Sequence, residues 1–217
     1  MAGLKIHLLG GLQISRADAP ITDFISNKVP ALLAYLAVTR RAHSRDKLAS
    51  LLWGEMSEAD AKNNLRQALA NLRRVADDHL TITRDSVEFS GGGFLDSSQF
   101  ESDVKSASSL DTSTLRHGER KTNRQDNASL SAGSEPASVI LTESLRLYRG
   151  DFLEGFFVRD APDFEDWMLA ERARLRELAL GALHTLTHFH TSRGNFTEAM
   201  TTASRLLTFD PWREEAH

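Results

Sequence analysis

The N-terminal part of the chain switches between strand-like and helix-like spacing of its apolar residues. LKIHLL and LQIS alternate apolar and polar residues on either side of Gly10-Gly11, which predicts a β-hairpin. In residues 27–41 the apolar residues recur at helical spacing. Pro30 falls in the first turn of this segment, where its missing N–H does little harm. A strand pair followed by a helix is therefore expected.

Two further helices and a second strand pair are expected next. Ser44 is a suitable N-cap for the helix in SRDKLASLLW, whose leucines form one apolar face. Ser57 and Asp60 have the spacing of a capping box, so the third helix is expected to begin at Glu58. LTITRDSVEF then reads as two short strands that turn at Arg84-Asp85. This order of elements predicts a winged helix-turn-helix.

Residues 105–137 differ in composition from both flanks. They include 7 Ser among 33 residues, no aromatic residue, and only Leu110, Leu115 and Leu130 as large apolar residues. Such a segment buries too little apolar surface to offset the entropy lost on ordering. A flexible insertion is therefore expected here.

Apolar spacing from residue 138 onward is helical. One helix is expected in VILTESLRLYRG, with Gly150 as its stop, and a long one in residues 163–193. A further helix is expected between Gly194 and Pro211. A helix pair with GN at its turn and DP after its second helix is typical of tetratricopeptide-like repeats. DPWREEAH stands where another repeat helix would begin, which suggests the N-terminal part of a longer regulator.

The predicted fold class is mixed and mostly α. An α+β winged helix-turn-helix is expected at residues 1–96. An all-α tetratricopeptide-like domain is expected at residues 97–217, with the flexible Ser-rich insertion at 105–137.

Composition narrows the possible functions. The chain has 217 residues, a formal net charge of −4 and no cysteine, which excludes disulfides, Cys-ligated metals and thiol catalysis. Its first residues read as a strand rather than as a secretion signal, and no apolar stretch approaches the length of a membrane span. We therefore expect a cytoplasmic protein without a membrane partner. Any nucleic-acid function must lie on a local patch, because the whole chain is mildly acidic.

The sequence offers no enzyme motif. It contains no phosphate-binding GxxxxGK[ST] loop, no GxGxxG and no nucleophile elbow, so we expect neither catalysis nor a cofactor. His184 and His188 have metal-compatible helical spacing, with His190 close by. No third ligand is evident, so these histidines are interpreted as packing and surface residues. No metal site is expected.

One helix departs from the acidic character of the chain. Residues 61–74, AKNNLRQALANLRR, hold four basic residues and no acidic one. Leucines and alanines recur along one side, and the other side displays basic and amide residues, including Asn71. Either a solvated surface or a surface for an anionic partner fits this pattern taken alone.

Four ordered segments carry a family resemblance: ALLAYLAVTRR, SRDKLASLLWGEMSEADAKNNLRQALANLRRV, LRLYRGDFLEGF with FEDWMLAERARL, and GNFTEAMTTASRLLTFDPWREEAH. Together they resemble the Streptomyces antibiotic regulatory protein (SARP) family. Its members join an OmpR-like winged helix to a bacterial transcriptional activator domain of tetratricopeptide type. The resemblance implies binding to direct repeats in promoter DNA, contact with RNA polymerase, and dimerisation through the helical domain.

The third helix is therefore interpreted as a DNA reader, because it precedes the predicted wing and its arginines lack acidic neighbours in the sequence. Arginine can donate two hydrogen bonds to guanine, and Asn or Gln can pair with the edge of adenine. The candidates for base contact are Asn63, Arg66, Gln67 and Ala70. The candidates for phosphate contact are Asn27, Lys28, Ser44, Arg45, Lys62, Arg73 and Arg74, with Arg84 at the tip of the wing.

Two functions remain open from the sequence. The first is a sequence-specific transcriptional activator that binds double-stranded promoter DNA, as a homodimer on paired sites, and recruits RNA polymerase. The second is a tetratricopeptide-like interaction scaffold or sensor module whose winged helix does not read DNA.

Overall fold

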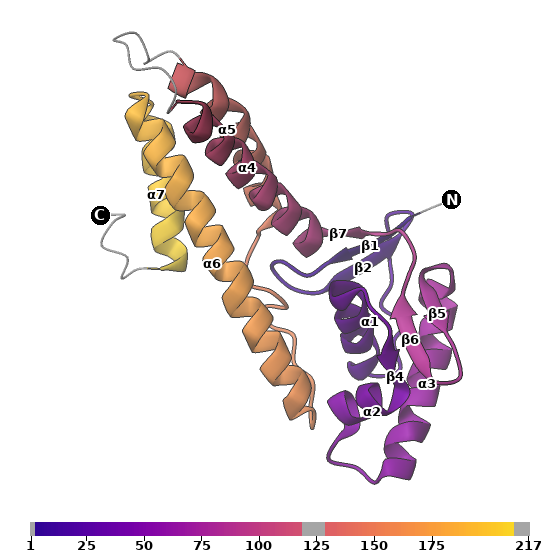
Figure 1. Ribbon diagram of the computed structural model, residues 1–217. Coiled ribbons are helices and arrows are strands. Elements are labelled where there is room, and N and C mark those ends of the chain that lie inside the picture. Colours follow the sequence, from indigo (N-terminus) through magenta and orange to yellow (C-terminus); the bar gives the residue numbers. More distant parts are fainter. Residues whose placement is uncertain (1–2, 119–128, 211–217) are drawn as a thin grey trace. The chain divides into compact units, whose positions relative to one another are not determined.

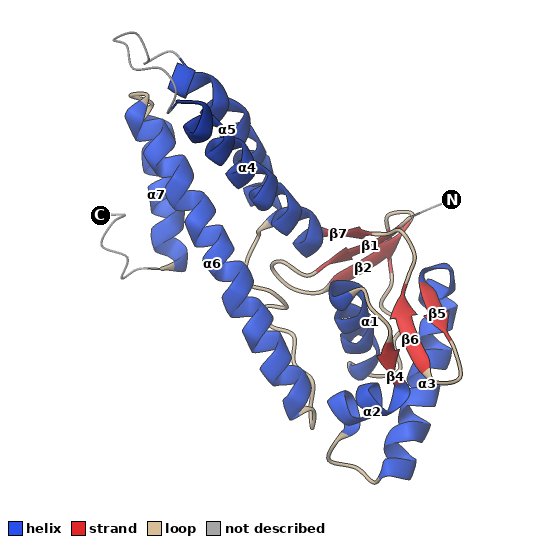
Figure 2. Cartoon of the chain, in the orientation of Figure 1, coloured by secondary structure: helices blue, strands red, loops and turns tan. Residues whose placement is uncertain are grey.

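The computed structural model describes residues 3–118 and 129–210 (Figure 1). The chain divides into two compact units by its contacts. Unit 1 comprises Met1–Ser97 and Gly150–Ala173, and unit 2 comprises Ser98–Arg149 and Arg174–His217. Every described strand belongs to unit 1, whereas the described part of unit 2 contains helices and loops (Figure 2). This division confirms the mixed, mostly α fold class.

Three helices form the centre of unit 1: α1 (Lys28–Thr39), α2 (Arg45–Trp53) and α3 (Glu58–Ala76). α1 is the core helix, with every residue from Val29 to Ala37 buried. Ser44 caps α2 by accepting a hydrogen bond from the Lys47 backbone N–H at 3.2 Å. Ser57 caps α3 in the same way through Asp60, at 3.3 Å. Both predicted helix starts are therefore confirmed.

Two small sheets complete the winged helix. The first has the order β3-β2-β1-β7, with β1 (Leu4–His7), β2 (Gln13–Arg16), β3 (Ala19–Pro20) and β7 (Phe94–Leu95). β1 and β2 form the predicted antiparallel hairpin, while β7 pairs with β1 in parallel, which was not predicted. The second sheet, β4-β6-β5, joins β4 (His43–Ser44) to the wing hairpin β5 (Leu80–Ile82) and β6 (Ser86–Phe89). A short 3₁₀ turn, η1 (Asp77–His79), links α3 to β5.

A segment distant in sequence belongs to the same unit. Residues 150–173 pack with the winged helix, and we call them the strap. The strap enters beside the first sheet, where Leu9 and Phe152 form an antiparallel bridge. The backbone N–H of Leu153 donates to the carbonyl of Leu8 at 2.7 Å. Unit 1 is therefore built from two parts of the chain.

The strap continues into the first turns of α6 (Pro162–Ser192) and packs through aromatic rings. Trp167 lies edge-on to Tyr35 of α1 with ring centroids 4.8 Å apart, and edge-on to Phe152 at 5.7 Å. Phe164 packs on Trp167 at 5.3 Å. Arg172 donates to the carbonyls of Phe152 and Leu153, at 2.9 and 3.0 Å, and holds the turn closed.

Unit 2 contains α4 (Asp96–Gly118), α5 (Ser129–Leu147), most of α6, and α7 (Phe196–Phe209). Phe100, Tyr148 and Phe209 form an aromatic cluster, with centroids 5.5 Å apart for Phe100–Tyr148 and 5.3 Å for Tyr148–Phe209. Arg205 donates to the carbonyls at the end of α5, Leu145 at 2.8 Å and Tyr148 at 2.6 Å. Pro211, expected to stop the last helix, lies outside the described residues.

The Ser-rich segment differs from the expectation. Within residues 105–137, α4 extends to Gly118 and α5 begins at Ser129, so the described parts are helical rather than irregular. Serine hydroxyls in the described part of this segment bond to backbone carbonyls about one turn back. Ser106 donates to the carbonyl of Ser102, for example, at 2.8 Å. Ala107 also buries its side chain. Residues 119–128 lie outside the description.

Candidate nucleic-acid interface

Helix α3 has one buried side and one exposed side. Its buried apolar residues are Ala61, Leu65, Ala68, Leu69, Leu72 and Ala76. The four predicted base contacts, Asn63, Arg66, Gln67 and Ala70, are all exposed and recur every three or four residues. Such spacing places them on a single helix face, which we call the reading face. Ala70 leaves room on this face for close approach of the helix backbone.

Two residues of the reading face are already paired. The Nη1 of Arg66 donates to the Oδ1 of Asn63 at 3.0 Å. This bond uses one N–H group of the guanidinium and leaves its other N–H groups for an external acceptor. It also restricts the Arg66 side chain before any ligand binds, and thereby lowers the entropy lost on binding.

Several predicted phosphate contacts meet beside the reading face. One cleft of about 360 Å³ is lined by Ser44, Arg45, Lys62 and the wing residue Arg84. Arg66 of the reading face, Asp46, Leu65 and Asp85 complete its lining. The cleft lies where the start of α2, the middle of α3 and the tip of the wing converge. Its charged lining is four basic residues and two acidic ones, a net of +2, in a chain whose net charge is −4.

Arg45 attaches the start of α2 to the wing. Its backbone N–H donates to the carbonyl of Asp85 at 3.0 Å, and its Nη1 lies 3.4 Å from the carbonyl oxygen of Arg84. The antiparallel pairing of Ser44 with Ser86 supports the same junction. Arg84 itself is exposed at the tip. The wing is therefore tied to the cleft through backbone geometry.

Lys62 is held by carboxylates. Its Nζ lies 2.5 Å from Glu58 Oε1 and 3.1 Å from Asp46 Oδ1. Hydrogen bonds to Glu58 and then Asp46 raise the pKa of Lys62, so its ammonium stays charged. A phosphate must compete with both carboxylates for it. Glu58 is four residues before Lys62 and could be anticipated from the sequence, whereas Asp46 comes from another helix.

Asn27 and Lys28 do not join the cleft. The Nζ of Lys28 donates to the carbonyls of Leu52 at 2.5 Å and Asp160 at 3.0 Å, and burial lowers the pKa of its ammonium. The Nδ2 of Asn27 donates to the carbonyl of Phe157 at 3.2 Å. Both side chains fasten the strap to the start of α1, a role that the sequence analysis did not predict.

The C-terminal half of α3 brings two corrections. The arginines of this helix were expected to lack acidic partners, but Arg74 lies 3.5 Å from Asp23, with both side chains exposed. Asn71 was expected on the exposed face, but the structure buries it, and its Oδ1 has no hydrogen-bond partner. Residue 71 follows buried Ala68 by three positions and therefore turns toward the core. Arg73 is exposed.

The histidines of α6 do not gather into a site. His184 and His188 are exposed, and His190 is half-buried. Across the described residues, no three His, Cys, Asp or Glu side chains come together as a metal site would require. No helix in the described ranges is both long and apolar enough to cross a bilayer.

Comparison with known proteins assigns the second half of the chain. Residues 110–217 match the family model for the bacterial transcriptional activator domain. Together with the winged helix, this activator domain gives the chain the SARP-type architecture.

A solved structure has the same fold. The chain is similar to Mycobacterium tuberculosis EmbR, determined in complex with a low-affinity phosphopeptide, with a TM-score of 0.73 and 20% sequence identity. The match covers 100% of this chain and 53% of that one, so the chain spans about half the length of its structural relative. No curated protein matches the chain.

Proposed function

We propose that the chain is a sequence-specific DNA-binding activator that reads the major groove with α3. The observation that carries this proposal is the reading face, where Asn63, Arg66, Gln67 and Ala70 are exposed together. A major groove admits an α-helix, and these side chains are suited to the edges of guanine and adenine. The bond between Asn63 and Arg66 supports the role, because it holds the arginine ready for a guanine.

Phosphate contacts would position the helix. The cleft presents Arg45, Lys62 and Arg84 beside the reading face, and a DNA backbone lying there would meet a locally positive surface. Arg84 at the wing tip is suited to an adjacent minor groove. Arg73 and Arg74 would hold phosphate near the end of α3. Asn27 and Lys28 would have to give up their hydrogen bonds to strap carbonyls before they could contact phosphate.

The remaining parts of the proposal come from the SARP resemblance. Two protomers would bind repeated sites on one side of promoter DNA, and the activator domain would contact RNA polymerase and a second copy of the chain. A cytoplasmic location fits this role.

The experiment first selects preferred sites from random DNA with the purified chain. Binding to the selected site and to a scrambled duplex is then measured across a salt series. A specific regulator loses affinity steeply with salt but keeps its preference for the selected site. A chain that binds neither duplex at low salt would instead be the interaction scaffold.

Two variants of α3 distinguish contact with bases from contact with phosphates. We expect Arg66→Ala to lose about 1–3 kcal/mol on the selected site and much less on scrambled DNA. Arg73→Ala is the matched control on the same helix. It is expected to weaken both duplexes alike and to lower the salt slope by about one. Equal losses on both duplexes for Arg66→Ala would show that Arg66 contacts only phosphate.

A further inference from the structure

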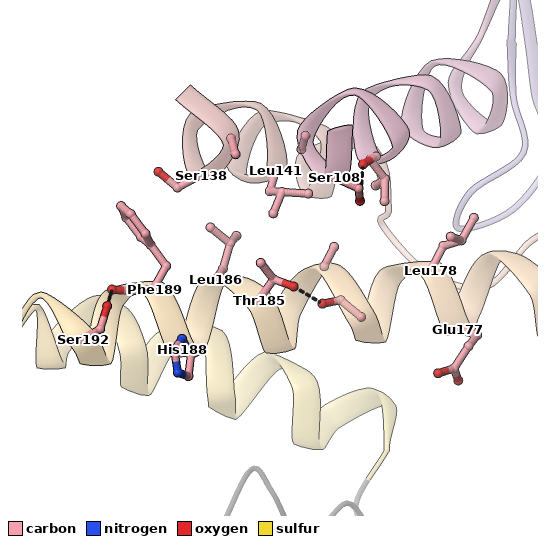
Figure 3. Close-up of a pocket in the computed structure, with 15 residues that line it drawn as sticks. Ser108, Ser138, Leu141, Glu177, Leu178, Thr185, Leu186, His188, Phe189 and Ser192 are labelled. Atoms are coloured by element: carbon pink, nitrogen blue, oxygen red, sulfur yellow. Dashed lines mark hydrogen bonds between the residues drawn. The ribbon is translucent and has the colours of Figure 1, made fainter. Parts of the chain in front are cut away.

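A cavity of about 610 Å³ lies within unit 2, and none of its lining residues is among those assigned above to DNA. Its walls come from α4, α5 and α6 (Figure 3). Leu141 extends from α5 toward α6, and Leu186 and Phe189 extend from α6 toward α5. Small-molecule sites in proteins typically enclose roughly 300–1,000 Å³ and are lined mainly by apolar side chains. The cavity has this size and this lining.

Small side chains on all three helices create the space. α4 contributes Ala107, α5 contributes Ala137, and α6 contributes Gly181 and Ala182. A Cβ atom added at Gly181 would meet nothing within 4 Å. Gly181 and Thr185 are exposed, so the cavity opens to solvent on this side of α6.

The polar groups of the lining favour a particular kind of partner. The hydroxyl of Ser138 is buried and donates to the carbonyl of Glu135 at 2.8 Å, and that of Thr185 donates to Gly181 at 2.9 Å. These hydroxyl hydrogens are therefore committed to the helix backbone. The oxygens can still accept a hydrogen bond. A ligand with an N–H or O–H donor would match them.

The ionisable side chains of the lining do not point into the cavity. Glu177 and His188 belong to the lining, but both side chains point away from α4 and α5 in Figure 3. A charged ligand would lose part of its hydration against the apolar walls without meeting an opposite charge there, which is costly. The chemistry therefore selects an uncharged molecule.

We propose that this cavity binds an uncharged, mostly apolar small molecule that carries one hydrogen-bond donor. The site would give the activator domain a ligand of its own, independent of DNA. It does not depend on the proposed function, since none of its residues belongs to the reading face or the cleft.

Two fluorescent dyes test the chemistry on the full-length chain. N-phenyl-1-naphthylamine is uncharged, mostly apolar and has one N–H donor, and 8-anilino-1-naphthalenesulfonate is the same framework with an anionic sulfonate. We expect saturable binding of the uncharged dye at one site per chain, with the sulfonate at least about tenfold weaker. Absence of saturable binding by the uncharged dye, or equal affinity for both dyes, would overturn the proposal. This comparison needs no variant.

A pair of substitutions then locates the site. Gly181→Phe places a ring into the cavity, whereas Gly181→Ala adds only the Cβ that the structure accommodates. We expect Gly181→Phe to weaken the uncharged dye at least about tenfold and Gly181→Ala to change it less than about threefold. Circular dichroism and a thermal transition check that both variants are folded. If a folded Gly181→Phe variant binds the dye as tightly as Gly181→Ala, the dye lies elsewhere and the assignment is wrong.

Discussion

Trp167 offers a direct test of whether the strap belongs to the winged-helix unit. The residue lies far along the sequence from α1, yet its ring meets Tyr35, Phe152 and Phe164 at centroid distances of 4.8, 5.7 and 5.3 Å. Removal of a buried Trp side chain costs about 3–5 kcal/mol. Trp167 is only half-buried, so we expect Trp167→Ala to lower the free energy of unfolding of unit 1 by about 2–3 kcal/mol.

Hydrogen exchange read by mass spectrometry measures this loss at α1. The amides of this helix are buried and should exchange only through cooperative opening of the unit. A loss of about 2–3 kcal/mol corresponds to exchange about 30- to 150-fold faster. The matched control is Leu169→Ala on the same helix, whose side chain is 53% exposed, and which should change the free energy by less than about 0.5 kcal/mol.

The opposite result is also informative. If the α1 amides of Trp167→Ala keep the protection of the unsubstituted chain, the strap adds no stability to the winged helix. The unit boundary would then lie at the end of β7 rather than include residues 150–173.

Three further predictions concern single positions. Ser57→Ala should cost about 1 kcal/mol in thermal or chemical unfolding of unit 1, because the backbone N–H of Asp60 loses its acceptor. Gly181→Ala should raise the stability of unit 2 by about 0.5–1 kcal/mol, since the added Cβ meets no atom within 4 Å and alanine favours the helix; a lower melting temperature would contradict this. Burial, and then the positive charges of Arg41 and Lys47, lower the pKa of His43 from 6.5. As pH falls, this histidine is therefore protonated more readily in the unfolded chain than in the folded one. Stability should therefore fall as pH drops below about 6.5, and His43→Gln should reduce that slope.

Much of the fold was predictable because its signals are local. A helix start depends on a side-chain oxygen three residues from a backbone N–H, so Ser44 and Ser57 could be identified as caps from the sequence. A hairpin depends on alternation and a turn, so the wing at Arg84-Asp85 could be identified too. The exposure of the predicted base contacts follows from helical periodicity alone.

Features missed at the candidate interface depend on distant parts of the chain. Lys62 meets Asp46 from another helix, and Arg74 lies near Asp23 from a loop. Lys28 was interpreted as a phosphate contact because nothing near it in sequence competes for its ammonium. The strap, more than a hundred residues later, supplies the carbonyl of Asp160 that does so. The charges of neighbouring residues in the sequence do not reveal acceptors that come from distant parts of the chain.

The sequence by itself determined the order of elements, the capped helix starts, the reading face of α3 and the SARP resemblance. Each depends on residues within one or two helical turns, or on motifs in order. Only the tertiary structure decided that the strap completes unit 1, that the Ser-rich helices bury part of their surface, and that a cavity remains between α4, α5 and α6. These outcomes depend on how separate segments pack, because burial and pairing arise only when distant side chains occupy the same space.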